Sequence, residues 1–401
     1  MLVALLTGVT GLAAWAPPAS FTPASISHAD LLSGGANHLF ASALADVGMV
    51  SVRDIPDYAA LRRAILPKFH ACAEVSHAAQ SHTFDDGATR RTLATLTVPG
   101  PGGAQKLPHE STDASCADFE QTAADFRSLV ADVTTHFTER LSSLLPSSPS
   151  PLLTTASGFE FPTLAAVATA GEHLEHFHAY TRPPPKSLDV AKAARGHLSR
   201  TIDTHTDQGL FIAFTPALMI KRGAPDDDPD SGTFYVELKD GSQAAAHLEP
   251  DHLIFMLGDG IHQVLPSRSG APIPSLRAVP HSVVTPVTAD PSAARVWYGR
   301  MVLPPSDALR PGHDAVGDSF GALRERMIDA SLTGDDKAEV SRSRSRPPRL
   351  PLASLTHTCS CVVMSRVDRR FLWAAPATTR APPTESSCRA RPAASIAGIG
   401  A

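Results

Sequence analysis

Two histidines and one aspartate in this chain could together bind a transition metal. His205 and Asp207 are separated by a single residue, and His281 lies far downstream in the apolar run 278–283 (AVPHSV). Alternate side chains of a strand point to the same face, so His205 and Asp207 can face the same space. A histidine from another strand would complete a set of two histidines and one carboxylate. Such a set binds Fe(II) on one side and leaves the opposite positions open.

The third ligand has two candidates in the sequence. His281 sits in a run typical of a packed strand, whereas His262 follows Gly258-Asp259-Gly260, which predicts a turn. We therefore favour His281, with His262 as the alternative. An H-x-D pair alone is weak evidence, because the chain holds 18 histidines.

A second histidine-rich stretch, residues 172–178 (EHLEHFH), has neither the H-E-x-x-H nor the H-x-x-E-H spacing of zinc hydrolases. It lies in the apolar-rich stretch 164–180, and we interpret it as a solvated helical face. No catalytic residue beyond the metal ligands is assigned.

The surrounding elements change character along the chain. Helical spacing dominates the first half, and short strands separated by turns follow residue 200. Helices are predicted over 41–48, 58–73 and 118–145, and strands over 49–52, 90–98, 209–220, 233–238, 252–257, 276–284 and 294–303. Short strands after a helical half predict an α+β fold, with a jelly-roll core (a double-stranded β-helix) supported by N-terminal helices.

The chain divides into three predicted parts. Residues 1–28 begin with an apolar stretch that favours a signal or plastid-targeting segment, or else an incorrectly assigned start. Residues 29–312 form the predicted domain, with a helical half over 29–200 and the jelly-roll core over 201–312. Residues 313–401 are rich in Arg, Pro, Ser and Ala, and we expect a disordered basic tail.

Composition limits the partners of the 401-residue chain. The hydrophobic fraction of 43% and charged fraction of 19% are those of a globular protein. A net charge of −5 does not predict a nucleic-acid partner, and beyond the N-terminal stretch no segment is long and apolar enough to insert stably in a membrane. The 5 cysteines are too few and too scattered for a disulfide framework.

The candidate ligands also carry a family resemblance. The sequence His205-Thr206-Asp207-Gln208-Gly209 resembles the H-T-D-x-G motif of the isopenicillin N synthase-like Fe(II)/2-oxoglutarate dioxygenases. Gly258-Asp259, His281 and Arg295-Val296-Trp297 then follow in the order of the family's Gly-Asp turn, distal histidine and R-x-S motif. The resemblance covers roughly residues 30–310, and Pro304 lies where the family has a closing proline.

The resemblance implies that His205, Asp207 and His281 bind Fe(II). It also implies that Arg295 pairs with the far carboxylate of 2-oxoglutarate as co-substrate, because a guanidinium matches a carboxylate with two hydrogen bonds. With O2, such an enzyme hydroxylates or desaturates a small organic substrate and releases succinate and CO2. Trp297, also assigned to the cofactor site, replaces the family's Ser and offers only a donor. Ser282 stands where the family usually has Arg.

Two other functions fit the same residues. A catalytically inactive jelly-roll protein could retain the fold for binding or scaffolding, with Trp297 filling the keto-acid pocket. A zinc hydrolase with the same ligands would act without O2, but no general base is evident beside them. Release of succinate dependent on Fe(II) and 2-oxoglutarate would separate an oxygenase from both.

Overall fold

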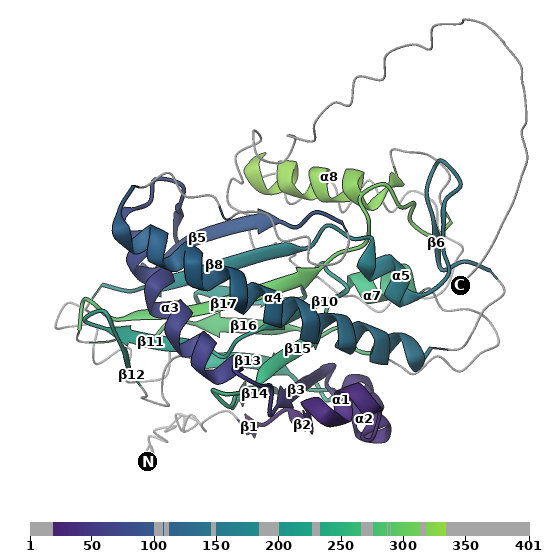
Figure 1. Cartoon of the computed structure of the whole chain (residues 1–401), viewed down its shortest axis with the longest axis horizontal. Helices are drawn as coiled ribbons and strands as arrows, with labels where there is room; N and C mark the ends of the chain where they lie inside the picture. The colour runs from purple at the N-terminus through teal and green to yellow at the C-terminus, as the bar shows by residue number, and fades with distance from the viewer. Residues whose placement is uncertain are drawn as a thin grey trace, which may run out of the picture. The chain divides into compact units, whose positions relative to one another are not determined.

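The computed structural model describes residues 19–99, 107, 112–145, 150–183, 200–226, 233–265, 276–286, 288, 290–312 and 318–333. The strands are β1 (Ala19–Phe21), β2 (Ala24–Ser27), β3 (Met49–Arg53), β4 (Gln80–Thr83), β5 (Thr89–Leu96), β6 (Leu153–Thr154), β7 (Glu160–Phe161), β8 (Leu174–Thr181), β9 (Ile202–His205), β10 (Phe211–Phe214), β11 (Leu218–Lys221), β12 (Ala224–Asp226), β13 (Thr233–Glu237), β14 (Gln243–Ala246), β15 (Leu253–Leu257), β16 (His281–Val284) and β17 (Ala294–Val302). The helices are α1 (His28–Ser33), α2 (Asn37–Asp46), α3 (Tyr58–Val75), α4 (Ala114–Ser143), α5 (Leu164–Thr169), α7 (Gly260–Val264) and α8 (Phe320–Thr333). Figure 1 shows their arrangement.

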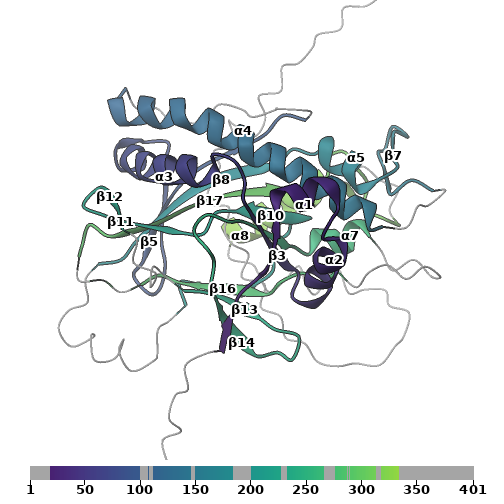
Figure 2. The same ribbon diagram turned by 60° about the horizontal axis from the view of Figure 1, so that its bottom comes forward.

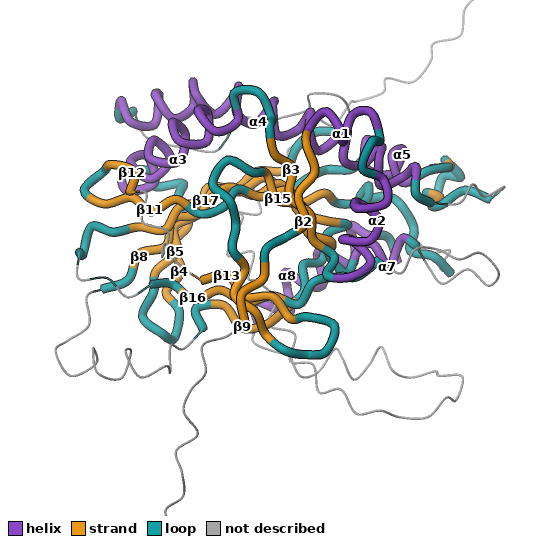
Figure 3. The backbone as a smooth tube through the Cα atoms, turned by 90° about the horizontal axis from the view of Figure 1, so that it is seen from below, coloured by secondary structure: helices purple, strands orange, loops and turns teal. Residues whose placement is uncertain are grey.

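Two large sheets form the centre of this α/β structure. The ten-stranded sheet has the order β2-β3-β15-β10-β17-β8-β5-β4, with β11 and β12 attached beside β17. The five-stranded sheet has the order β1-β14-β13-β16-β9. Helices α3 and α4 run along one face of the larger sheet, and the smaller sheet lies toward its other face (Figure 2). Figure 3 shows β13, β16 and β9 across from β15 and β17.

Alternation along β10 explains how the larger sheet supports two apolar layers. Phe211 belongs to the core beneath the helices, where its ring lies 4.8 Å from that of Phe137 of α4. Ile212 and Phe214 point the other way and join the apolar cluster with the smaller sheet, where Phe214 lies 5.5 Å from Phe234 of β13. A strand of a sheet that is covered on both faces has apolar side chains on both sides, which explains the continuous apolar run of β10. The single strand predicted over 209–220 is in fact two strands, β10 and β11, separated by residues 215–217.

The histidine-rich stretch is not a solvated helix, as the sequence had suggested. It forms β8, which pairs with both β17 and β5 and whose residues from Leu174 to Tyr180 are all buried. His176, His178 and Tyr180 point to one face of the sheet, and Glu175 and Phe177 to the other. The acidic side chain is tolerated in this strand because Arg127 of α4 binds its carboxylate.

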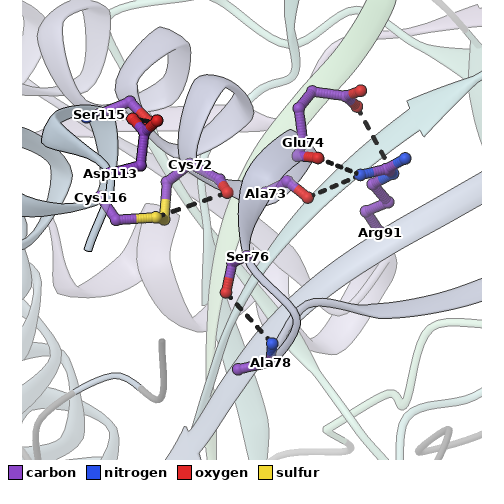
Figure 4. Close-up of a disulfide and its surroundings, with 9 residues drawn as sticks. All are labelled: Cys72, Ala73, Glu74, Ser76, Ala78, Arg91, Asp113, Ser115 and Cys116. Atoms are coloured by element: carbon purple, nitrogen blue, oxygen red, sulfur yellow. Dashed lines mark hydrogen bonds and ion pairs between the residues drawn. A yellow bond between two sulfur atoms is a disulfide. The ribbon is translucent and has the colours of Figure 1, made fainter. Parts of the chain in front are cut away.

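A buried disulfide joins Cys72, near the end of α3, to Cys116, in the first turn of α4 (Figure 4). The cysteines are separated by 44 residues in sequence. Closing a loop of that length removes chain entropy from the unfolded state worth about 4 kcal/mol. This pair could not be predicted from the sequence, because contact between the two helices, not cysteine spacing, brings the thiols together.

Ordered structure extends past both predicted limits of the domain. Strands β1 and β2, which pair with β14 and β3, lie inside the stretch expected to be a targeting segment. Helix α8 lies inside the stretch expected to be a tail. Residues 1–18, 313–317 and 334–401, which make up most of the rest of those two segments, are outside the described residues. Among the described residues, no helix has the length and apolarity required to span a membrane.

Candidate active site

The three candidate ligands meet at one end of the smaller sheet. Strands β9 and β16 are antiparallel, and His205 lies directly opposite His281, with ring centroids 4.3 Å apart. Asp207, two residues after the end of β9, places Oδ1 at 3.9 Å from Nε2 of His205 and at 4.0 Å from Nε2 of His281. One ligand atom from each residue lies within 4.8 Å of the others, close enough for all three to bind one metal ion.

Hydrogen bonds orient both imidazoles toward this point. Nδ1 of His205 lies 2.8 Å from the carbonyl oxygen of Asp203, and Nδ1 of His281 lies 3.0 Å from that of Val279. A carbonyl only accepts, so each Nδ1 carries the proton and each Nε2 keeps a lone pair for a metal. Burial and the neighbouring His205 lower the pKa of His281 to about 4, which keeps its imidazole neutral at physiological pH.

The turn at Gly258 and Asp259 supports the loop that carries Asp207. The backbone N–H of Asp259 donates to the carbonyl of Asp207 at 2.7 Å, and the hydroxyl of Thr206 donates to the Asp259 carboxylate at 2.5 Å. A Cβ on Gly258 would lie 2.5 Å from the carbonyl oxygen of Gly209, so this close approach requires glycine. The Gly-Asp turn therefore positions the metal-binding loop.

A cavity of about 190 Å³ adjoins the three ligands. The ten-stranded sheet supplies one wall with side chains of β5, β8 and β17, the five-stranded sheet supplies others, and α8 contributes Phe320, Leu323, Arg324 and Met327. On β17, Arg295 and Trp297 line the cavity, whereas Tyr298 belongs to the core beneath the helices. The two residues that the sequence assigned to a cofactor thus share a cavity with the three candidate ligands.

Buried polar atoms of this cavity that have no hydrogen-bond partner include Nε of Arg295, the hydroxyl of Tyr180 and Nε1 of Trp297. Arg295 and Tyr180 lie directly opposite each other on β17 and β8. Buried donors without partners are costly, so this group fits a polar ligand that accepts hydrogen bonds. Burial lowers the pKa of Arg295 to about 10, and the guanidinium stays charged at neutral pH. A carboxylate of a keto acid matches this set of donors.

His176 and His178 also line the cavity, and the sequence did not identify them as part of the site. Their rings are 4.5 Å apart, and the ring of Trp297 lies 5.4 Å from that of His176 and 4.9 Å from that of His178. Burial lowers the pKa of His176 to about 4 and that of His178 well below its ordinary value. Alternation of polar and apolar residues over 176–179 (HFHA) was the signal that could have placed them on a strand.

The alternative third ligand lies elsewhere. His262 is exposed on α7, and the cavity lining takes Gln263 from that helix instead. Ser282, at the position where the resembled family usually has Arg, is buried, and its hydroxyl has no hydrogen-bond partner. It follows His281 on β16 and points to the opposite face of the strand.

Comparison with known proteins bears on the fold. No protein-family model matches the chain, and no curated protein does. Among solved structures, JOX2 in complex with 2OG, Fe and JA matches with a TM-score of 0.50 and 12% identity, over 79% of this chain and 90% of that chain. Full-length Neurospora crassa T7H in complex with alpha-KG and 5-formyluracil matches with a TM-score of 0.47 and 14% identity, over 76% and 94% of the two chains. The chain therefore has a fold similar to that of JOX2.

Proposed function

We propose that this protein is an Fe(II)- and 2-oxoglutarate-dependent oxygenase of the isopenicillin N synthase-like group, built on a double-stranded β-helix. Its reaction would hydroxylate or desaturate a small organic substrate and release succinate and CO2. The observation that carries this proposal is the convergence of His205, Asp207 and His281 within 4.8 Å of one another. We assign the function to the domain predicted over residues 29–312, extended by α8 because that helix lines the cavity.

Each site residue has a role in this proposal. The two Nε2 atoms and the Asp207 carboxylate would bind the metal from one side. Bound Fe(II), with 2-oxoglutarate and O2, supplies the oxidising power that attack on a C–H bond requires. Arg295 and Tyr180 would hold the far carboxylate of the keto acid, and the half-buried Trp297 would offer its N–H where the family has a hydroxyl. JOX2, whose fold is similar, was crystallised with 2OG and Fe, which supports the same ligands here.

Binding can be tested before any substrate is known. Anaerobic protein is titrated with Fe(II) and then 2-oxoglutarate, and the visible metal-to-ligand band of the keto acid on iron is recorded. We expect the band in the wild type, no band in His205→Ala, and a band in Arg295→Gln only at much higher 2-oxoglutarate concentrations. Oxygen is then admitted and succinate is measured.

The outcomes separate the candidate functions. Succinate formation in the wild type, absent in His205→Ala, supports the oxygenase. Iron binding without the band and without succinate favours an inactive binding protein, in which the Trp297 ring fills the keto-acid position. Hydrolytic activity with Zn(II) in the absence of O2 would favour the hydrolase.

A further inference from the structure

We propose that the substrate of this site is a small, largely apolar molecule with a hydroxyl group, which His176 binds beside the candidate metal centre. This inference rests on the proposed oxygenase function and names its substrate class. His176 lies on β8, is 6% exposed and lines the same cavity as the three candidate ligands. No hydrogen bond joins its ring nitrogens to any other described residue, so the ring can still donate to a ligand and accept from it.

Small residues on both neighbouring strands make room for this ring. Ala94 of β5 lies directly opposite His176 on one side, and Gly299 of β17 lies directly opposite it on the other. A Cβ on Gly299 would lie 2.5 Å from Nε2 of His176, so the imidazole occupies the space where a side chain of β17 would otherwise stand. The same Cβ would lie 3.0 Å from a side-chain carbon of Ile212 and 3.0 Å from one of Trp297. The ring therefore extends from β8 over β17, and these neighbours restrict its movement.

His176 is separate from the proposed keto-acid site. His176 and Tyr180 are four residues apart on the same face of β8, and at about 3.3 Å per residue their backbones are about 13 Å apart. Arg295 pairs with Tyr180, whereas Gly299 pairs with His176. The side chains proposed to hold the far carboxylate of the keto acid thus lie toward one end of β8, and His176 lies toward the other.

The charges that act on the two histidines of β8 place His176 nearer the candidate metal centre. Burial lowers the pKa of His176 to about 4, although the charge of Asp207 raises it. Burial lowers the pKa of His178 as well, and the charge of Arg295 adds to that effect. His176 therefore faces the same space as the metal-binding carboxylate, and its imidazole is neutral at physiological pH.

A neutral imidazole at this position fits an uncharged hydroxyl. The ring has one N–H donor and one acceptor nitrogen, and a hydroxyl can both donate and accept, so the two groups can pair with either tautomer of the histidine. Apolar side chains line much of the rest of the cavity: Ile212, Phe214, Met256, Met301, Leu303 and Leu323. In these surroundings, a substrate without the hydroxyl would displace water and leave the imidazole without a partner, which lowers affinity.

Matched pairs of small molecules test this assignment. Phenol with toluene, and benzyl alcohol with ethylbenzene, differ by a hydroxyl in place of a methyl group. Binding is measured by calorimetry to anaerobic protein loaded with Fe(II) and saturating 2-oxoglutarate, and the ratio of the two dissociation constants gives the preference for the hydroxyl. We expect His176→Leu to lower this preference about tenfold for at least one pair, because a buried hydrogen bond is lost. His176→Asn, which keeps a donor and an acceptor, should retain part of it.

A second variant tests the position of the ring without removing it. In Gly299→Ala the new Cβ would displace the imidazole, so the preference for the hydroxyl should fall although His176 is present. His38→Leu, at an exposed position of α2 that does not line the cavity, is the control and should keep the wild-type preference.

Several results would overturn the proposal. It is wrong if neither hydroxyl compound binds, or if the preference is unchanged in folded His176→Leu and Gly299→Ala proteins, because another group would then bind the hydroxyl. It is also wrong if His176→Leu weakens 2-oxoglutarate as much as Arg295→Gln does, because His176 would then serve the keto acid. Failure of the oxygenase proposal is distinguishable: the visible band would be missing, while the preference for the hydroxyl, measured on the metal-free protein, would remain and would still depend on His176.

Discussion

His205 and His281 face each other directly across the β9–β16 ladder, with ring centroids 4.3 Å apart. The hairpin of β13 and β14 lies between these strands in the sequence, and β13 pairs with β16 on the side away from β9. Pairing of β9 with β16 therefore brings the two imidazoles together. The metal site depends on the register of a single strand pair.

The first prediction concerns the choice of the third ligand. His281→Ala should weaken Fe(II) binding by more than about 100-fold, because loss of an outer hydrogen-bond partner alone costs about 10- to 100-fold in metal affinity. His262→Ala, which changes an exposed side chain of α7, should leave the affinity within twofold. Anaerobic calorimetry with Fe(II) measures both. Equal losses of Fe(II) affinity in the two variants would show that His281 is not a metal ligand.

The second prediction tests the support of the Asp207 loop. In Gly258→Ala, the new Cβ would lie 2.5 Å from the carbonyl oxygen of Gly209 and 2.6 Å from that of Asp207. These are backbone atoms, so the loop must shift, at a cost of about 1–3 kcal/mol for such overpacking. We expect Fe(II) affinity to fall at least tenfold in a protein that still unfolds cooperatively. Gly35→Ala is the control, because the nearest atom there is an Asp30 carboxylate oxygen that can move away. Unchanged affinity in Gly258→Ala would show that the turn does not position the ligand.

The sequence predicted the elements whose signals are local. The apolar run around His281 and the H-x-D spacing were enough to pick out three residues that the structure brings together. Strands such as β3 and β5, and helices α3 and α4, fall within a few residues of their predicted ranges because each has a clear periodicity. The pairing of distant strands leaves no local signal in the sequence. Sequence context could therefore rank His281 above His262 as the third ligand, but it could not settle the choice.

The two wrong predictions, for residues 172–178 and for α8, share one physical cause. In both, the residues that surround the segment in the structure lie far from it in the sequence. Polar residues over 172–178 suggested contact with water, yet Glu175 is fully buried because Arg127 and Arg300 neutralise it from α4 and β17. Helix α8 was missed because its apolar side chains cover a cavity whose other walls come from distant strands. Neither set of contacts has a signature within the segment concerned.

The third prediction concerns how much the buried cluster of Glu175, Arg127 and Arg300 contributes to the stability of the fold. Glu175 accepts hydrogen bonds from Arg127 at 2.6 Å and from the Tyr298 hydroxyl at 3.0 Å, and it also pairs with Arg300. Glu175→Gln leaves two buried guanidinium groups without their carboxylate, so the free energy of unfolding should fall by about 3–5 kcal/mol. Asp118→Asn breaks the exposed pair with Lys68 and should cost about 0–1 kcal/mol. Denaturant unfolding measures both, and similar losses would mean that the buried cluster adds no special stability.

The fourth prediction concerns the stability of the metal-free protein in mild acid. Burial, with the charges of Arg300 and Arg324, lowers the pKa of His173 to about 3. The unfolded chain takes up a proton near pH 6.5 and the folded chain does not, so the stability contributed by the neutral imidazole is present above pH 6.5 and is lost as the pH falls below it. Between pH 7.5 and 5.5 this histidine accounts for about 1.4 kcal/mol of lost stability.

A variant isolates this contribution from that of the other histidines. His173→Gln keeps an acceptor for the backbone N–H of Leu303, which lies 3.3 Å from Nδ1 of His173 in the wild type. Its stability loss from pH 7.5 to 5.5 should be smaller than that of the wild type by about 1.4 kcal/mol. His38→Gln, at an exposed position of α2, should show the same loss of stability between the two pH values as the wild type. If urea unfolding at the two pH values gives the same loss for His173→Gln and the wild type, His173 takes up its proton in the folded state and the proposed burial of a neutral imidazole is wrong.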